Sequence, residues 1–280
     1  MIFLGQRSPE ASTLRAVENE PSPDMVLYDV RDGSAWLTIN RPDHRNALDG
    51  AVIQGLLKGL KRAAEDDAAR TVILTGAGDR AFCAGADLGG MQPAGGRVQE
   101  HLRRGRIGEL LTAIPEHPKP VVARVNGHAL AGGFGLMLSC DLAVSADDAE
   151  FGTPEVNLGL WPFMISAVIR RNVPRKIALE MMLTGRRVSA AEAERWGMVN
   201  RLAPRADLDD AVGELVAVLH AKSPLALRLG KESFHASQDM PFREALAYLN
   251  AMLTVDLESE DVSEGISAFL QKRPPEWKGR

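Results

Sequence analysis

Two clusters of small residues in this chain have the composition of a backbone anion site, residues 84–88 and residues 126–136. Each follows a short β-rich run, and the second leads into an apolar helical run over residues 134–140. The first N–H groups of a helix have no partner inside the helix, and glycine lets a ligand come close to the backbone. Such turns could hold a phosphate, a carboxylate or the oxyanion that develops on a carbonyl. A tight packing turn without a ligand is the alternative at this point.

The elements that position these clusters alternate between strand and helix in the first half of the chain. Residues 25–30 and 35–40 flank a turn and predict a hairpin, and the apolar spacing over 47–64 predicts a helix. Further strands are expected at 71–75, 120–125 and 141–145, with a helix over 98–114. The rear of the chain predicts helices over 163–172, 175–183, 190–197, 207–221, 224–237, 242–257 and 261–272. This order indicates an α/β fold with a parallel sheet and a trailing helical region.

Composition excludes several classes of protein. The net charge of −4 and the pI near 5.9 give no electrostatic argument for nucleic acid or for an anionic membrane. The two cysteines lack disulfide or metal spacing, which suits a reducing cytoplasm, and we predict no metal. No apolar run has the length of a membrane span. Residues 1–24 mix charges and prolines without the apolar core of a signal peptide, and we interpret them as a flexible leader.

Several short motifs then fit one family in order and spacing. They are Ala84-Gly85-Ala86-Asp87-Leu88, Asn126-Gly127-His128-Ala129, Gly132-Gly133, Cys140-Asp141-Leu142, Phe151-Gly152-Thr153-Pro154-Glu155, Leu183-Thr184-Gly185-Arg186 and Gly197-Met198-Val199-Asn200. From about residue 25 to the end, the chain resembles the crotonase family, the enoyl-CoA hydratase/isomerase superfamily. The resemblance implies a spiral of ββα turns over residues 25–205. It also implies a C-terminal helical region over residues 206–280 that serves trimerisation, often as a dimer of trimers.

The resemblance gives the two small-residue clusters a role. In this family two backbone N–H groups hold the thioester oxygen of an acyl-CoA, and by position these belong to Ala86 and Gly132. Chemistry next to the thioester carbonyl builds enolate charge on that oxygen. Two fixed donors stabilise the enolate more than the ground-state carbonyl, and the loss of one such donor typically costs about 3 kcal/mol in the barrier.

The acid–base groups follow the family only in part. Glu155 matches the second of the two glutamates that the family's hydratases use, and burial in an apolar pocket should raise its pKa. The first glutamate is missing, because its position is Gly135. Glu109, on the preceding helix, is an alternative second acid. The departure puts a two-carboxylate hydration mechanism in doubt but leaves the acyl-CoA site intact.

Other substrate contacts are expected from the resemblance. The CoA phosphates and adenine suit Arg45, Phe269 and Lys272, the last two sometimes from a neighbouring subunit, with surface cations as the alternative for the two basic residues. The remaining predicted contacts are Ala84, Asp87, Gly133, Gly135 and Trp161. Asp87 is equally suited to a helix N-cap, and Trp161 to the core.

The function expected first is hydration of a 2-enoyl-CoA thioester, with Glu155 handling the proton and with no cofactor apart from the CoA of the substrate. Isomerisation of a 3-enoyl to a 2-enoyl thioester needs only one base and is the next hypothesis. An acyl-CoA binding protein with little catalysis is the third. The expected assembly is a homotrimer or a dimer of trimers.

Overall fold

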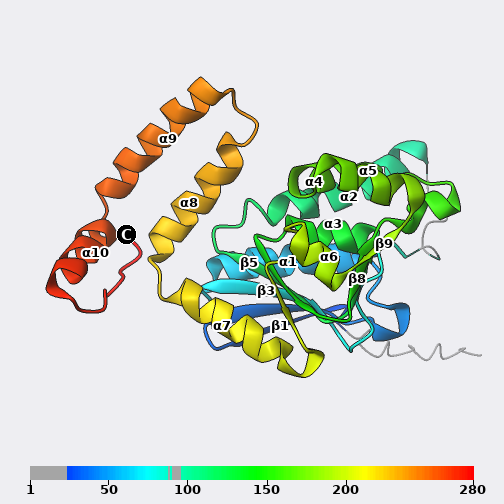
Figure 1. The fold of residues 1–280 in the computed structure, drawn as a ribbon, viewed down its shortest axis with the longest axis horizontal. Coiled ribbons are helices and arrows are strands. Elements are labelled where there is room, and N and C mark those ends of the chain that lie inside the picture. Colours follow the sequence, from blue (N-terminus) through cyan, green and yellow to red (C-terminus); the bar gives the residue numbers. More distant parts are fainter. Residues whose placement is uncertain (1–23, 88, 90–95) are drawn as a thin grey trace, which may run out of the picture.

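The structure is a computed structural model, and the residues described are 24–87, 89 and 96–280. The predicted leader, residues 1–24, lies outside this part except for Asp24. Within the described residues the strands form two sheets (Figure 1). The larger, in the order β1-β2-β3-β5-β7-β10, comprises Val26–Arg31, Ser34–Ile39, Thr71–Gly76, Val121–Val125, Leu142–Ala146 and Arg201–Ala203. The smaller, in the order β4-β6-β8-β9, comprises Ala81–Cys83, His128–Leu130, Glu150–Gly152 and Arg187–Ser189.

Helices connect the strands and then continue alone to the C-terminus. The α-helices are α1 (Gly50–Glu65), α2 (Arg97–Ala113), α3 (Gly132–Ser139), α4 (Phe163–Asn172), α5 (Arg175–Thr184), α6 (Ala190–Arg195), α7 (Leu208–His220), α8 (Pro224–Ser237), α9 (Phe242–Leu257) and α10 (Glu260–Gln271). Short 3-10 helices are η1 (Pro42–His44), η3 (Pro154–Leu158) and η4 (Arg205–Asp207). None of these described helices combines the length and the apolar character that a membrane span requires.

The chain winds as a spiral in which successive turns add one strand to each sheet. Strand β3 of the larger sheet leads into β4 of the smaller, β5 leads into β6, and β7 leads into β8. The strands β4, β6 and β8 are followed by α2, α3 and η3 respectively. Apart from the β1–β2 hairpin, the paired strands of the larger sheet are parallel. The predicted α/β fold with a spiral of strand–strand–helix turns is confirmed.

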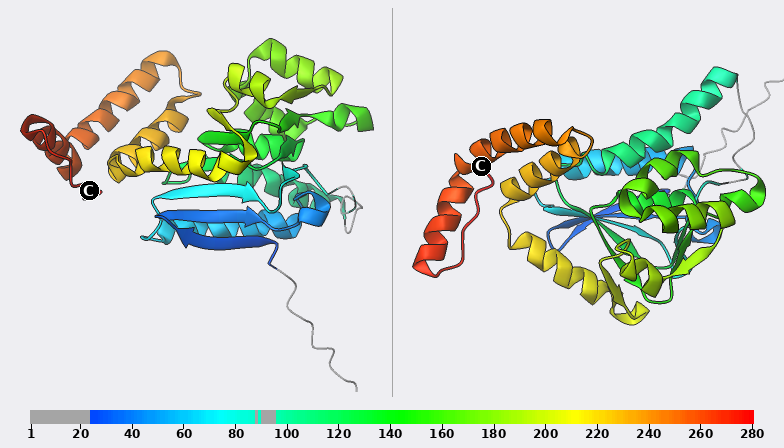
Figure 2. Two further views of the ribbon diagram at one scale, coloured as in Figure 1. Left: turned by 60° about the horizontal axis from the view of Figure 1, so that its bottom comes forward. Right: turned by 45° about the horizontal axis from the view of Figure 1, so that its top comes forward.

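The two faces of the larger sheet bury different helices because side chains alternate along a strand. Leu74 of β3 lies in the main core with Leu56 of α1, whereas its neighbour Ile73 lies in a second cluster with Leu208 and Val212 of α7. By packing, α7 therefore belongs to the sheet. Helices α8, α9 and α10 form an arm that extends away from both sheets (Figures 1 and 2).

Most of the elements expected from the sequence are present with small shifts at their ends. The helices predicted over 163–172, 224–237 and 242–257 coincide with α4, α8 and α9. The smaller sheet has no counterpart among the strands expected above. That sheet is what brings the two small-residue clusters together.

Candidate active site

The smaller sheet gathers three segments at one edge. Its strands β4, β6 and β8 are adjacent and parallel, so their carboxyl ends lie side by side. The segments that leave this edge are residues 84–87, 131–133 and 153–155. Each carries one of the predicted catalytic residues: Ala86, Gly132 and Glu155 respectively.

The N–H of Ala86 is oriented by a short parallel bridge to Leu48. The N–H of Leu48 donates to the carbonyl of Gly85 at 2.7 Å, and the N–H of Asp87 donates to the carbonyl of Leu48 at 2.9 Å. Because backbone groups alternate sides along an extended chain, the N–H of Ala86 points away from Leu48. Within the described residues it donates to no backbone or side-chain acceptor.

The N–H of Gly132 lies close to that of Ala86. A Cβ built on Gly85 would lie 3.2 Å from the nitrogen of Gly132, and a Cβ built on Gly132 would lie 3.8 Å from the nitrogen of Ala86. Gly132 is the first residue of α3, so its N–H has no partner inside the helix. Two backbone donors without acceptors among the described residues therefore lie next to each other, as an oxyanion site requires.

The backbone is strained where this pair is formed. Ala131 precedes α3 with φ 50° and ψ −128°, a conformation that residues with a Cβ rarely adopt. Its N–H donates to the carbonyl of Gly152 at 2.8 Å, which ties the start of α3 to β8. Gly85 also has a positive φ of 97°, and a side chain there would come within 2.6 Å of the Cβ of Ala131. Backbone strain of this kind is concentrated at functional sites.

Two buried asparagines, which the sequence analysis did not assign to the site, hold the turn before β4. The amide nitrogen of Asn46 donates to the carbonyls of Ala77 and Ala81 at 2.9 and 2.7 Å. Asn126 donates to Gly78 at 2.7 Å and accepts the N–H of Gly76 at 3.1 Å. An Asn within a turn signals such side-chain-to-backbone bonding, but the sequence does not show which backbone groups it binds.

Glu155 lies in η3, directly after β8. Its side chain is half-buried, and within the described residues its Oε2 is buried without a hydrogen-bond partner. Burial raises the pKa of this carboxyl, in the direction that the sequence analysis expects. Thr153, two residues earlier, has a fully buried hydroxyl that also lacks a partner in the described part of the chain. A carboxyl with a raised pKa and one uncommitted oxygen is suited to taking up and returning a proton.

Gly135 lies one turn after Gly132 on α3, and Ile165 of α4 fills the space beside it. A Cβ built on Gly135 would lie 2.2 Å from the Cγ2 of Ile165, whose side chain is buried. A glutamate cannot enter that space unless Ile165 moves. Glu109 does not replace it, because its carboxylate is 63% exposed on α2 and lies 4.0 Å from Arg106. This exposed position gives no support to Glu109 as the alternative second acid.

The structure brings some of the predicted substrate contacts to this edge. The carbonyl of Arg45 accepts the N–H of Ala84 at 3.0 Å, so the two residues are adjacent, and the Arg45 side chain is exposed. Gly133 is packed so tightly that a Cβ there would lie 2.1 Å from the carbonyl oxygen of Cys83. Asp87 forms an ion pair with Arg41 at 2.9 Å, and this contact lowers the pKa of Asp87.

Three further predicted substrate contacts do not lie at this edge of the smaller sheet. Trp161 is half-buried and packs against the main core. Phe269 is 82% exposed near the end of α10, and Lys272 follows at its C-cap. Within one chain this end of the arm lies away from the smaller sheet (Figures 1 and 2). Contact of Phe269 or Lys272 with an acyl-CoA would therefore require a second copy.

The spiral of strand–strand–helix turns with a helical arm defines a protein of the crotonase fold. Comparison with known proteins agrees with this assignment of the fold. Residues 30–280 match the model of the family described as Enoyl-CoA hydratase/isomerase. The chain belongs to this family.

Individual relatives cover nearly the whole chain. It is 39% identical over 261 residues to a carnitinyl-CoA dehydratase of Escherichia coli, covering 91% of this chain and 98% of the relative. It is 33% identical over 259 residues to the mouse protein named enoyl-CoA hydratase domain-containing protein 3, mitochondrial, covering 92% and 86%. A crystal structure of an enoyl-CoA hydratase from Mycobacterium smegmatis has 37% identity and a TM-score of 0.86, covering 90% of this chain and 98% of that one.

Proposed function

We propose that this protein isomerises an enoyl-CoA thioester by moving its double bond from C3 to C2, with Glu155 as the single acid–base group. The carboxylate takes a proton from C2, and the electron pair shifts through the thioester to its oxygen. The N–H groups of Ala86 and Gly132 stabilise the resulting enolate. The same carboxyl then returns the proton at C4, so no co-reactant is consumed.

The observation that carries the proposal is the environment of Glu155 and Gly135 together. Glu155 has a half-buried carboxyl with a raised pKa and, within the described part of the chain, one oxygen without a partner, which suits a base that must also act as an acid. The space beside Gly135, where a second carboxylate would stand in a hydratase of this family, is taken by Ile165. A one-base reaction fits this site better than a reaction that shares water activation and proton transfer between two groups.

Hydration of a 2-enoyl-CoA, or the reverse dehydration, is the second candidate. The observation in its favour is that relatives at 31–39% identity are named hydratases or a dehydratase. In that case Glu155 alone would activate the water and supply the proton.

Mass spectrometry separates the two candidates. Purified protein is incubated with panels of 2-enoyl-CoA and 3-enoyl-CoA in ¹⁸O-labelled water. The proposal expects 3-enoyl-CoA to become 2-enoyl-CoA, which has the same mass and is separated from it by liquid chromatography before the mass measurement. Addition of labelled water to 2-enoyl-CoA would instead establish hydration and contradict the proposal. Tight binding of the thioesters without conversion of any panel member would favour a binding protein.

The proposed assembly is a homotrimer or a dimer of trimers formed through the arm. The exposed large apolar side chains of α8–α10 support it: Phe234, Phe242, Leu246, Leu249, Leu253, Val255, Leu257, Ile266, Phe269 and Leu270. Large apolar side chains exposed together on a few helices commonly mark an interface. Sedimentation of a monomer at micromolar concentration would contradict this assembly.

A further inference from the structure

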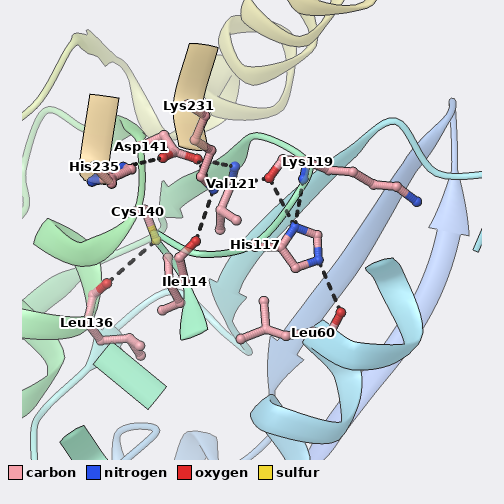
Figure 3. A network of polar contacts seen from close by, with 10 residues as sticks. All are labelled: Leu60, Ile114, His117, Lys119, Val121, Leu136, Cys140, Asp141, Lys231 and His235. Atoms are coloured by element: carbon pink, nitrogen blue, oxygen red, sulfur yellow. Dashed lines mark hydrogen bonds and ion pairs between the residues drawn. The ribbon is translucent and has the colours of Figure 1, made fainter. Parts of the chain in front are cut away.

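A buried lysine fastens the arm to the core. Lys231 lies on α8, and its side chain is only 8% exposed. Its Nζ lies 2.7 Å from Asp141 Oδ2 and donates to the carbonyls of Ile114 and Lys119 at 3.0 and 3.2 Å (Figure 3). These contacts match the three donors of an ammonium group. Burial lowers the pKa of Lys231, and the nearby Asp141 carboxylate opposes that effect.

The partners of Lys231 lie at the ends of elements that border the candidate site. Ile114 is the C-cap of α2. Asp141 follows the C-cap of α3, Cys140, and its Oδ2 also accepts the N–H of Val121 at 2.7 Å, at the start of β5 (Figure 3). The N–H of Asp141 donates to the carbonyl of Val121 at 2.9 Å. His235 of α8 also contacts Asp141, with its Nε2 3.5 Å from Oδ1 (Figure 3). Lys231 makes the shorter of these two contacts from the arm to the residue that follows α3.

The other end of α3 provides the N–H of Gly132. The helix has eight residues and is buried from Gly133 to Ser139. The backbone of α3 is closely packed at two glycines, since a Cβ at Gly133 would lie 2.1 Å from the Cys83 carbonyl oxygen and a Cβ at Gly135 2.2 Å from Ile165. A short, closely packed helix moves as a unit, so a displacement of its C-terminal end changes the direction of its first N–H groups.

We infer that Lys231 is a positioning residue, which sets the alignment of the Gly132 N–H with the Ala86 N–H through Asp141 and α3. A buried ion pair is seldom more stabilising than apolar packing of the same volume. We therefore assign to the Lys231–Asp141 pair a role in fixing geometry and not in adding stability. The inference rests on the proposed function. If Lys231 has this role, the oxyanion site is fully formed only when the arm is docked on the core.

The test uses the double variant Lys231→Met with Asp141→Asn in the full-length protein. Asparagine keeps an acceptor for the Val121 N–H, and removal of both charges avoids a buried unpaired ion. The probe is butyryl-CoA labelled with ¹³C at the thioester carbonyl, a saturated ligand whose bound chemical shift reports polarisation by the two N–H donors. The matched control is Arg124→Met with Asp209→Asn, which removes the ion pair between β5 and α7, 2.5 Å in length.

We expect the variant to bind butyryl-CoA with its bound carbonyl shift moved back toward that of the free ligand. Its kcat should fall at least tenfold while KM stays within about threefold, and the control should retain both the shift and kcat. An unchanged carbonyl shift with unchanged kcat would overturn the inference, whatever the change in melting temperature. If the double variant does not fold, Lys231→Arg decides by the same readouts, since a guanidinium retains the charge but cannot reproduce the three contacts.

The wild-type protein separates this inference from the proposed function. If bound butyryl-CoA shows no carbonyl polarisation in the wild type, the oxyanion site itself is wrong. If the wild type polarises the carbonyl and the double variant does so equally, only the role of Lys231 is wrong.

Discussion

The side chain of Ile165 occupies the space that any side chain at Gly135 would need. A Cβ added at Gly135 would lie 2.2 Å from Cγ2 and 2.6 Å from Cβ of Ile165. Glycine within a helix is less favourable than alanine by up to about 1 kcal/mol, so its presence on α3 indicates a packing requirement. The contact links α3, which begins at Gly132, to α4.

The first prediction concerns this contact. Gly135→Ala should lower the free energy of unfolding by about 1–3 kcal/mol because it overpacks the core. Measured in an Ile165→Gly background, where the nearest remaining atom of residue 165 is its Cα at 3.6 Å, the same change should be neutral or stabilising by up to about 1 kcal/mol. Urea unfolding of the four proteins gives the double-mutant cycle. Gly213→Ala on α7 is the control, since a Cβ there meets nothing within 4 Å, and it should not destabilise. Additive effects at 135 and 165 would contradict the packing account.

The second prediction concerns Asn126. Its side chain is 2% exposed, and its Oδ1 accepts the buried N–H of Gly76 at 3.1 Å, a partner that alanine removes. Asn126→Ala should lower the free energy of unfolding by about 1–3 kcal/mol, the typical cost of one buried unsatisfied group. Asn172→Ala, an exposed asparagine of α4 that bonds within its own helix, should change it by less than about 0.5 kcal/mol. Equal effects of the two substitutions in chemical denaturation would argue against the clamp.

The third prediction concerns the strained Ala131. Ala131 has φ 50° and ψ −128°, and the strain of a Cβ in such a conformation costs about 1–3 kcal/mol of folding free energy. Glycine removes this strain, but it also raises the entropy of the unfolded chain, which offsets part of the gain in stability. Ala131→Gly should therefore raise the melting temperature slightly, whereas Ala131→Val should lower it strongly. Differential scanning calorimetry measures both. A destabilised glycine variant would mean that the contacts of the Ala131 methyl outweigh the strain.

The fourth prediction follows from the raised pKa of Glu155. The folded state holds this proton more tightly than the unfolded state does. The stabilising contribution is therefore complete below the unfolded pKa, near 4.5, and is lost as pH rises through the folded pKa. Relative to Glu155→Gln, the wild type should become less stable as pH rises from 4.5 toward neutrality. Denaturant titrations of both proteins across this range provide the comparison, and a stability difference that does not vary with pH would contradict the assignment.

The sequence predicted the helices because long periodic runs such as residues 163–172 and 242–257 carry a clear pattern. It also predicted five of the six strands of the larger sheet and missed the three-residue strand β10. The smaller sheet was not predicted. Strands such as Ala81–Cys83 and His128–Leu130 have three residues each, too few to show a period, and they are defined by pairing between distant segments. The small-residue clusters could still be found, because glycine and alanine signal close backbone approach wherever the pairing partner lies.

The surroundings of the site were harder to predict than its members. The resemblance assigned Ala86, Gly132 and Glu155 from motif positions, and the structure places their three segments at one edge. The contact between Ile165 and Gly135, and that between Lys231 and Asp141, join residues 30 and 90 positions apart by side-chain packing. A single sequence contains no periodic or turn signal for such pairs.

Glu155→Gln tests the central claim most directly, namely that one carboxyl performs all the proton transfer at an acyl-CoA site. Turnover of the best enoyl-CoA substrate and the Kd for butyryl-CoA are measured for both proteins. General acid–base catalysis is typically worth about 10²- to 10⁴-fold, so turnover should fall at least a hundredfold while the Kd stays within about threefold. Turnover within a few-fold of the wild type would remove Glu155 from the mechanism and contradict the account.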